Sequence, residues 1–143
     1  MSSVISREVP GDHIQISTDP ATEPFWLEAK AHRLTCAKCG DCGHCWLPPS
    51  PYCGVCQSQN ITWPTLAGTG TVFSFAICHR SPFPDVPDFT YVPVVVDLDG
   101  APGARLVSNL IGVDPDAVHI GMKLTVEWTP IQDGWVLPNF RAA

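Results

Sequence analysis

Cysteines crowd residues 36–56 at spacings that suit a metal ion. They are Cys36, Cys39, Cys42, Cys45, Cys53 and Cys56. Two CxxC pairs supply the four thiolates of a zinc-ribbon site, because the two-residue spacing turns the backbone and lets both sulfurs face one ion. The pattern predicts one tetrahedral four-cysteine site. We expect zinc there, although a single iron ion can use the same ligands.

The spacing does not decide which four cysteines bind. The downstream pair Cys53–Cys56 is unambiguous, but the upstream pair has three candidates. Cys36–Cys39 and Cys39–Cys42 are each followed by a glycine, which tolerates the backbone of a tight turn. The third candidate, Cys42–Cys45, is followed by Trp46 instead of a glycine and is therefore the least suitable. An iron–sulfur cluster is disfavoured, because the CxxCxxC run lacks the later spacing and the proline of a ferredoxin motif.

A closed four-cysteine shell indicates a structural metal, since catalytic zinc keeps an open position. The rest of the chain shows no recognisable nucleophile, base and orienting group. Cys78 and His79 are adjacent in a predicted strand, so their side chains point to opposite faces. We interpret Cys78 as a small core residue. We therefore predict no catalytic residues and no enzymatic activity for the chain on its own.

Charge and composition restrict the partners. The chain of 143 residues has a net charge of −6 and only 8 lysines and arginines, which disfavours nucleic acid because phosphate neutralisation dominates such binding. We see no signal peptide and expect no membrane span. Cysteines in CxxC pairs without a secretory signal indicate a reducing compartment, so we expect a cytoplasmic protein.

The sequence predicts three segments, of which the second holds the cysteines. We expect a tail and helix in residues 1–35, with the helix over 20–34, a zinc ribbon in 36–67, and a barrel in 68–143. The helix has an apolar face formed by Phe25, Trp26, Ala29 and Leu34. That face either packs on its own chain or docks on a partner. Residues 57–67 are predicted to be a linker or the last ribbon strand.

The last segment is predicted to be mainly β. Strands are expected over 68–80, 91–99, 104–113, 123–131 and 135–142, with a helical turn at 114–118. This order is typical of a five-stranded OB-fold barrel. In the first strand we expect Phe73, Phe75 and Ile77 on one face and Val72 on the other. Pro93 indicates an edge position or a bulge in the second strand.

Several motifs, in one order, resemble a known family. They are PFWLEA, a CxxCG knuckle, LPPSPYCGVC, GTGTVFSF, LVSNLIGVDPDAVHIGMKLTVEW and VLPNF. Over residues 20–141 the sequence resembles domain of unknown function 35, whose members combine an N-terminal helix, a rubredoxin-like zinc ribbon and an OB-fold.

The resemblance also implies the metal ligands. In the family the double proline lies six residues beyond the second cysteine of the first knuckle, and counting back from Pro48 reaches Cys42. The implied ligands are Cys39, Cys42, Cys53 and Cys56. Cys36 and Cys45 are then additional thiols outside the family pattern.

Members of that family are partner subunits of thiolase-superfamily and hydratase enzymes, including acyltransferases, thiolases and aldolases of steroid side-chain degradation. The resemblance implies a non-catalytic accessory subunit in a hetero-oligomeric acyl-CoA-processing complex, which also helps to hold the CoA thioester. A free-standing acyl-CoA-binding protein is the alternative. A nucleic-acid-binding OB and ribbon module fits the charge poorly.

Contacts with a ligand or partner are expected on the helix, on the loop after the first barrel strand and on the third barrel strand. OB-folds use the loop after the first barrel strand for ligands, which is residues 79–90 here. The candidate contact residues are Phe25, Trp26, His79, Arg80, Phe83, Arg105 and Asn109.

Overall fold

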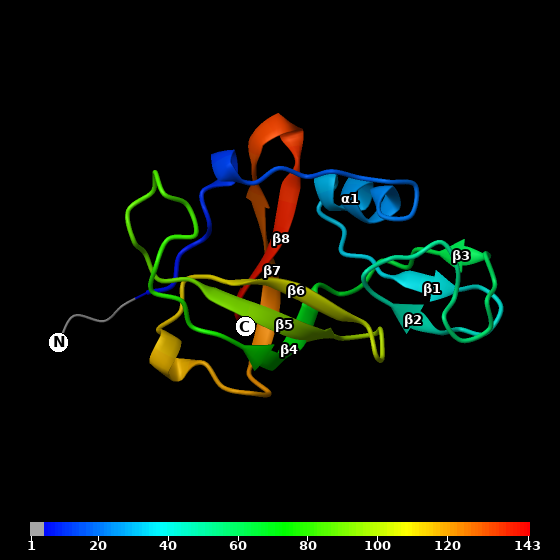
Figure 1. Ribbon diagram of the computed structural model, residues 1–143. Helices are drawn as coiled ribbons and strands as arrows, with labels where there is room; N and C mark the ends of the chain where they lie inside the picture. The colour runs from blue at the N-terminus through cyan, green and yellow to red at the C-terminus, as the bar shows by residue number, and fades with distance from the viewer. Residues whose placement is uncertain (1–4) are drawn as a thin grey trace.

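The computed structural model describes residues 5–143 and shows a barrel with a small ribbon and one α-helix beside it (Figure 1). A short 3-10 turn, η1 (Gly11–His13), precedes helix α1 (Glu23–Lys30). The ribbon contains β1 (Ala37–Cys39), β2 (Cys45–Trp46) and β3 (Ile61–Thr62), in the sheet order β2-β1-β3. Residues 57–67 therefore include the last ribbon strand, which was one of the two alternatives.

The barrel is closed and has the strand order β4-β5-β6-β8-β7. Its strands are β4 (Thr69–Phe75), β5 (Val92–Leu98), β6 (Arg105–Leu110), β7 (Lys123–Pro130) and β8 (Val136–Ala142). The 3-10 turns η2 (Pro115–Ala117) and η3 (Gln132–Gly134) flank β7. All pairings are antiparallel except β6 with β8, which meet in parallel at Leu110 and Phe140. The expected mainly-β OB-type architecture is confirmed.

One apolar core joins the barrel to the helix and ribbon. The barrel interior contains Val72, Val92, Val94, Val96, Leu98, Leu110, Leu124 and Phe140. Phe25, Leu34, Cys36 and Cys45 from the helix and ribbon belong to the same cluster. Because the packing is continuous, the helix face at Phe25 packs on its own chain, which was one of the two alternatives for that face. The domain boundaries after residues 35 and 67 stay a prediction.

The helix is shorter than the predicted 20–34. Asp19 accepts hydrogen bonds from the backbone N–H groups of Ala21 and Thr22, each at 2.9 Å, and forms a turn that delays the helix start to Glu23. At the other end His32 has a φ of 60°. That left-handed backbone ends the helix, as a glycine usually does.

Two strand expectations were wrong. Phe73 and Phe75 were expected on one face, but a bulge between Val72 and Ser74 shifts the register. Phe73 is therefore 44% exposed, whereas Phe75 packs against the core that contains Val72. Pro93 is neither at an edge nor at the bulge, because β5 lies between β4 and β6. It lies just beyond the paired end of β4, where the Ala76 N–H donates to the Pro93 carbonyl at 3.0 Å.

Gly70 explains part of the GTGTVFSF motif. A Cβ at this position would overlap the Asp97 carbonyl oxygen and lie 2.6 Å from a methyl group of Val96. β4 and β5 can therefore approach closely only with a glycine here. Within residues 5–143, no helix has the length and hydropathy needed to cross a bilayer.

Candidate metal centre and docking groove

The structure brings together Cys39, Cys42, Cys53 and Cys56, whose sulfurs all lie within 4.8 Å of one another. The Cys39 and Cys56 sulfurs are 3.5 Å apart, and those of Cys42 and Cys53 are 3.6 Å apart. Zinc bonds of about 2.3 Å in a tetrahedron require sulfur separations of about 3.8 Å. The donor set and its spacing therefore fit one tetrahedral zinc or iron ion.

Backbone N–H groups in each knuckle prepare the sulfurs for a cation. The N–H groups of Asp41 and Cys42 each lie 3.4 Å from the Cys39 sulfur, and the Val55 N–H lies 3.3 Å from the Cys53 sulfur. These donors, led by Cys42 N–H, lower the pKa of Cys39 to about 6. The pKa of Cys53 is also lowered, chiefly by the Cys56 N–H. Thiolate, the form that binds metal, is thus favoured at these two positions.

The other side of the cluster shows why four thiolates need a counter-charge. The Ser58 N–H lowers the pKa of Cys56, but the neighbouring thiols of Cys39 and Cys42 outweigh it and raise the value to about 12. Adjacent negative sulfurs repel one another, so the protein groups alone do not ionise the whole set. A divalent cation removes this repulsion and holds all four as thiolates.

A polar network links the two knuckles. The Asp41 carboxylate accepts from the Ser58 hydroxyl and from the Asn60 side-chain amide, the latter at 3.3 Å. The Gly40 N–H donates to the Asn60 carbonyl at 2.7 Å, and a Cβ on Gly40 would come within 2.5 Å of the Asn60 amide nitrogen. The glycine after Cys39 thus lets the second knuckle approach.

The remaining cysteines lie outside the cluster. Cys36 is fully buried and Cys45 is 6% exposed, both within the apolar core. Burial, together with the nearby Cys45, raises the pKa of the Cys36 thiol to about 12, so Cys36 remains protonated. Cys78 is half-buried and pairs through its backbone with Tyr91. The described geometry thus favours the Cys39–Cys42 pair over Cys36–Cys39.

An apolar groove runs between α1 and β6. One part, of about 270 Å³, is lined by Phe25 and Trp26 of α1, by residues 106–109 of β6 and by residues 137–139 of β8. The other, of about 260 Å³, extends past Trp26 and Arg105 to Pro48 and Pro49 of the ribbon. We call these together the α1–β6 groove. Val107 is shared by both parts and is 74% exposed.

Comparison with known proteins places this architecture in a family. Residues 63–129 match the family model described as the C-terminal OB-fold domain of ChsH2. The solved structure titled "Ltp2-ChsH2(DUF35) aldolase" contains a chain with 32% sequence identity and a TM-score of 0.80. The match covers 90% of this chain and 98% of that one. The chain belongs to the DUF35 family.

Two curated relatives of this DUF35 protein are larger. The probable enoyl-CoA hydratase alpha subunit of Thermomonospora curvata is 39% identical over 83% of the present chain and 37% of its own. The 3-oxo-4,17-pregnadiene-20-carboxyl-CoA hydratase alpha subunit of Mycobacterium tuberculosis is 33% identical over 95% of this chain and 42% of its own. The DUF35 protein thus spans about two fifths of each relative's length.

The predicted contact residues of the DUF35 protein fall into two separate places. Phe25, Trp26, Arg105 and Asn109 line the α1–β6 groove. His79, Arg80 and Phe83 do not; they lie on the loop after β4. There His79 Nδ1 bonds the Thr90 hydroxyl at 3.0 Å, while the Ser81 N–H donates to Asp88 at 3.0 Å.

Sequence reasoning missed three contributors to these places. Val107 looked like an ordinary strand residue, and only the closed barrel shows that it points into the groove mouth. Pro48 lines the groove, but nothing in the sequence around it indicates this. His13, in the lead-in segment, contacts the loop after β4 through Phe83, with ring centroids 4.6 Å apart. No local sequence pattern predicts such a contact, because it depends on tertiary packing.

Proposed function

We propose that this protein is a non-catalytic accessory subunit of an acyl-CoA-processing complex, and that it binds a thiolase-superfamily or hydratase enzyme. The observation that carries the proposal is the near-complete match to a chain of the "Ltp2-ChsH2(DUF35) aldolase" structure. The two curated relatives support it, because both are named as alpha subunits of hydratases that act on CoA thioesters.

In this proposal Cys39, Cys42, Cys53 and Cys56 hold one structural zinc ion, with iron as the alternative in the same site. Four thiolates fill the coordination shell, so the ion supplies a fold-stabilising cross-link and leaves no position for substrate. The short ribbon strands of two or three residues bury little apolar surface of their own. Such a segment depends on its metal for stability.

The α1–β6 groove is the proposed docking face for the enzyme subunit. Exposed aliphatic and aromatic side chains beside a concave surface are typical anchors for protein partners. Trp26 is partly exposed in the groove wall, and Val107 lies at its mouth. Arg105 borders the groove; its guanidinium lies 3.8 Å from the centre of the Phe73 ring on β4 and pairs with Asp97, so a charged group marks this edge of the groove.

Co-purification with an encoded enzyme partner tests the proposal. The chain is co-expressed with a thiolase-like, aldolase or hydratase protein from the same gene neighbourhood, and complex formation is measured by size-exclusion chromatography. Val107→Asp places a charge at the groove mouth and should weaken the complex at least tenfold. Ile120→Asp is the matched control, because Ile120 is 63% exposed and lies outside the groove. An enzyme that is fully active alone and never co-elutes contradicts the proposal.

A second candidate function, acyl-CoA binding by the chain itself, is favoured by one observation. The Asn109 side-chain oxygen is buried at the groove and accepts no hydrogen bond among the described residues. An apolar chain that carries an N–H donor, such as a pantetheine arm, would satisfy it. Calorimetry with an acyl-CoA on the isolated chain tests this. Binding that is lost in Asn109→Leu supports it, and no heat at millimolar ligand rules it out.

A further inference from the structure

The segment before α1 crosses one side of the barrel as a strap, which we define as residues 5–18 (Figure 1). Its first anchor is buried, since the Ser6 hydroxyl donates to the Leu110 carbonyl at 2.8 Å. Further on, the Asn109 amide donates to the Arg7 carbonyl at 3.1 Å, and the Gln132 amide donates to the Ile14 carbonyl at 2.7 Å. Val9 and Ile14 of the strap form part of the wall of the α1–β6 groove. Movement of the strap would therefore widen the groove.

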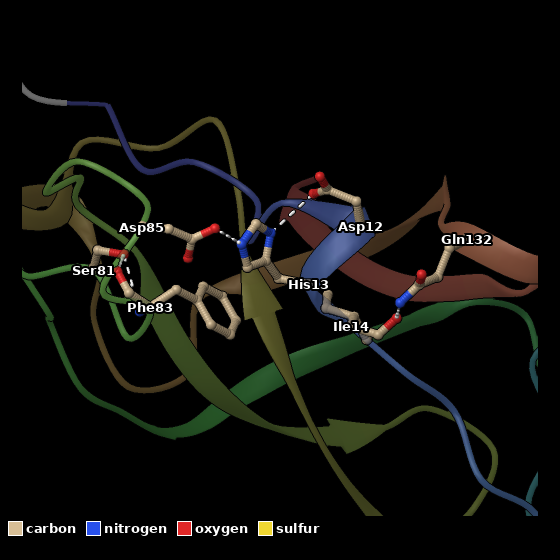
Figure 2. Close-up of polar contacts among 7 residues, drawn as sticks. All are labelled: Asp12, His13, Ile14, Ser81, Phe83, Asp85 and Gln132. Carbon is tan, nitrogen blue, oxygen red and sulfur yellow. Dashed lines mark hydrogen bonds and ion pairs between the residues drawn. The ribbon is translucent and has the colours of Figure 1, made fainter.

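His13 joins the strap to the loop after β4 (Figure 2). Its Nε2 lies 2.8 Å from a carboxylate oxygen of Asp85, which is 72 positions away, and its Nδ1 lies 3.0 Å from Asp12. The ring also packs against Phe83 of the same loop. The loop is itself braced, because the Ser81 hydroxyl donates to the Phe83 carbonyl at 3.0 Å. The strap and the loop thus meet through one imidazole.

Both charged groups that contact this imidazole are negative. Asp12 comes from its own turn and Asp85 from the loop. The neighbouring strap contact from η3, Gln132, is neutral, and Asp88 of the loop accepts from Ser81 N–H instead. An imidazolium donates from both nitrogens, whereas a neutral ring has one N–H and one lone pair. A neutral ring therefore turns a lone pair toward one of the two carboxylates.

We propose that the protonated form of His13 fastens the strap to the loop after β4, so that pH controls how firmly this wall of the α1–β6 groove is held in place. The direction of the pH dependence follows from the two carboxylates. The hydrogen bond to Asp85, and to a smaller extent the one to Asp12, raises the pKa of His13 above 6.5. The part of the clamp that depends on the ring's charge then contributes fully below about pH 6.5 and is lost as the pH rises through the raised value. The His13 side chain is 23% exposed and its partners are more so. We therefore expect a local opening rather than unfolding.

Hydrogen exchange at the Arg7 amide measures this clamp, because that N–H donates to the Thr90 carbonyl at the end of the same loop, at 2.9 Å. After correction for intrinsic rates, we expect its protection factor to fall about two- to fivefold between pH 6 and pH 8.5, the range of an exposed ion pair. His13→Gln should show the lower value at both pH values. Asp85→Asn should do the same, whereas Asp12→Asn should keep the higher value at pH 6, because it leaves the contact with Asp85.

An independent readout is the ring titration of His13 followed by NMR in the intact chain. The proposal requires a midpoint above that of an ordinary histidine, which moves down in Asp85→Asn. Barrel amides such as that of Val96 should keep their protection in every variant. Equal protection of Arg7 at the two pH values, or the same pH response in His13→Gln, would overturn the proposal. So would a His13 midpoint at or below the ordinary value.

Discussion

The sulfur of Cys39 lies 3.5 Å from the sulfur of Cys56, although 17 positions separate the two residues. Each belongs to a different knuckle, so this contact and its counterpart between Cys42 and Cys53 bring the two halves of the ribbon together. Four reduced cysteines whose sulfurs pack this closely have the arrangement that a small cation between the knuckles requires.

Replacement of one cluster cysteine should remove the metal. Cys39→Ser replaces a soft thiolate with a hydroxyl that binds zinc poorly, so elemental analysis should fall from one ion per chain to near zero. Cys36→Ala is the matched control, because Cys36 lies in the same ribbon but outside the cluster. It should keep one ion and lose about 1 kcal/mol or less in the free energy of unfolding, as for a small core truncation. Loss of the ion in Cys36→Ala alone would reverse the ligand assignment.

Chelation should unfold the ribbon before the barrel. Structural zinc contributes roughly 10 kcal/mol or more of binding free energy in small zinc domains, and β1, β2 and β3 cannot replace that with their own packing. In NMR spectra recorded with a strong chelator, amide signals from residues 36–62 should collapse to unfolded positions, while β5 signals stay dispersed. Restoration by added zinc is the control. An unchanged ribbon spectrum after complete metal removal contradicts the structural role.

Gly70→Ala should destabilise the barrel. The added methyl group meets the backbone of Asp97 and a side-chain methyl of Val96, and neither can move without separating β4 from β5. Overpacking of this kind costs about 1–3 kcal/mol, measurable by urea denaturation. Gly54→Ala provides the comparison, since nothing lies within 4 Å of its added Cβ and it should be near neutral. Equal stability of the two variants would mean that the strands can separate freely.

Substitutions at two nearby helix positions, Phe25 and Leu27, should differ strongly in their effect on the free energy of unfolding. Phe25 is 5% exposed and belongs to the core, whereas Leu27 is 49% exposed. Phe25→Ala should therefore lower the free energy of unfolding by about 3 kcal/mol or more, while Leu27→Ala should change it by less than about 0.5 kcal/mol. Thermal denaturation of both variants measures this. A large loss in Leu27→Ala would show that the outer helix face is covered in the free protein.

Most of the barrel could be predicted because its signals are local. The run of β-branched residues over 92–98 specifies a strand without knowledge of the rest of the chain. The pair Asp114–Pro115 does the same for the turn η2, where the Asp114 side chain accepts from the Asp116 N–H and Pro115 takes the first position. The cysteine pairs likewise predict a site, but spacing alone left the upstream pair open. Burial of Cys36 in the shared core favours Cys39–Cys42, and burial of that kind is a tertiary property.

The errors arose where tertiary contacts override local pattern. A bulge between Val72 and Ser74 puts Phe73 and Phe75 on different faces of the first strand, and simple alternation cannot reveal a bulge. Pro93 suggested an edge, but a closed barrel has none. Two further features join segments that are far apart in the chain: the groove at Val107 and the contact between His13 and Asp85. A short stretch of sequence cannot predict either of them.

Strand β8 lies between β6 and β7 and closes the barrel through the parallel pairing of Leu110 with Phe140. During synthesis, β4 to β7 can pair before β8 leaves the ribosome, which leaves β6 and β7 as open edges. Unpaired edges invite association between chains. The nascent protein is therefore most vulnerable to aggregation in the interval before residues 136–142 emerge, and a chaperone or the partner enzyme would act most usefully at that stage. A purified chain truncated after Trp135, which lacks β8, should associate more readily in solution than the full chain.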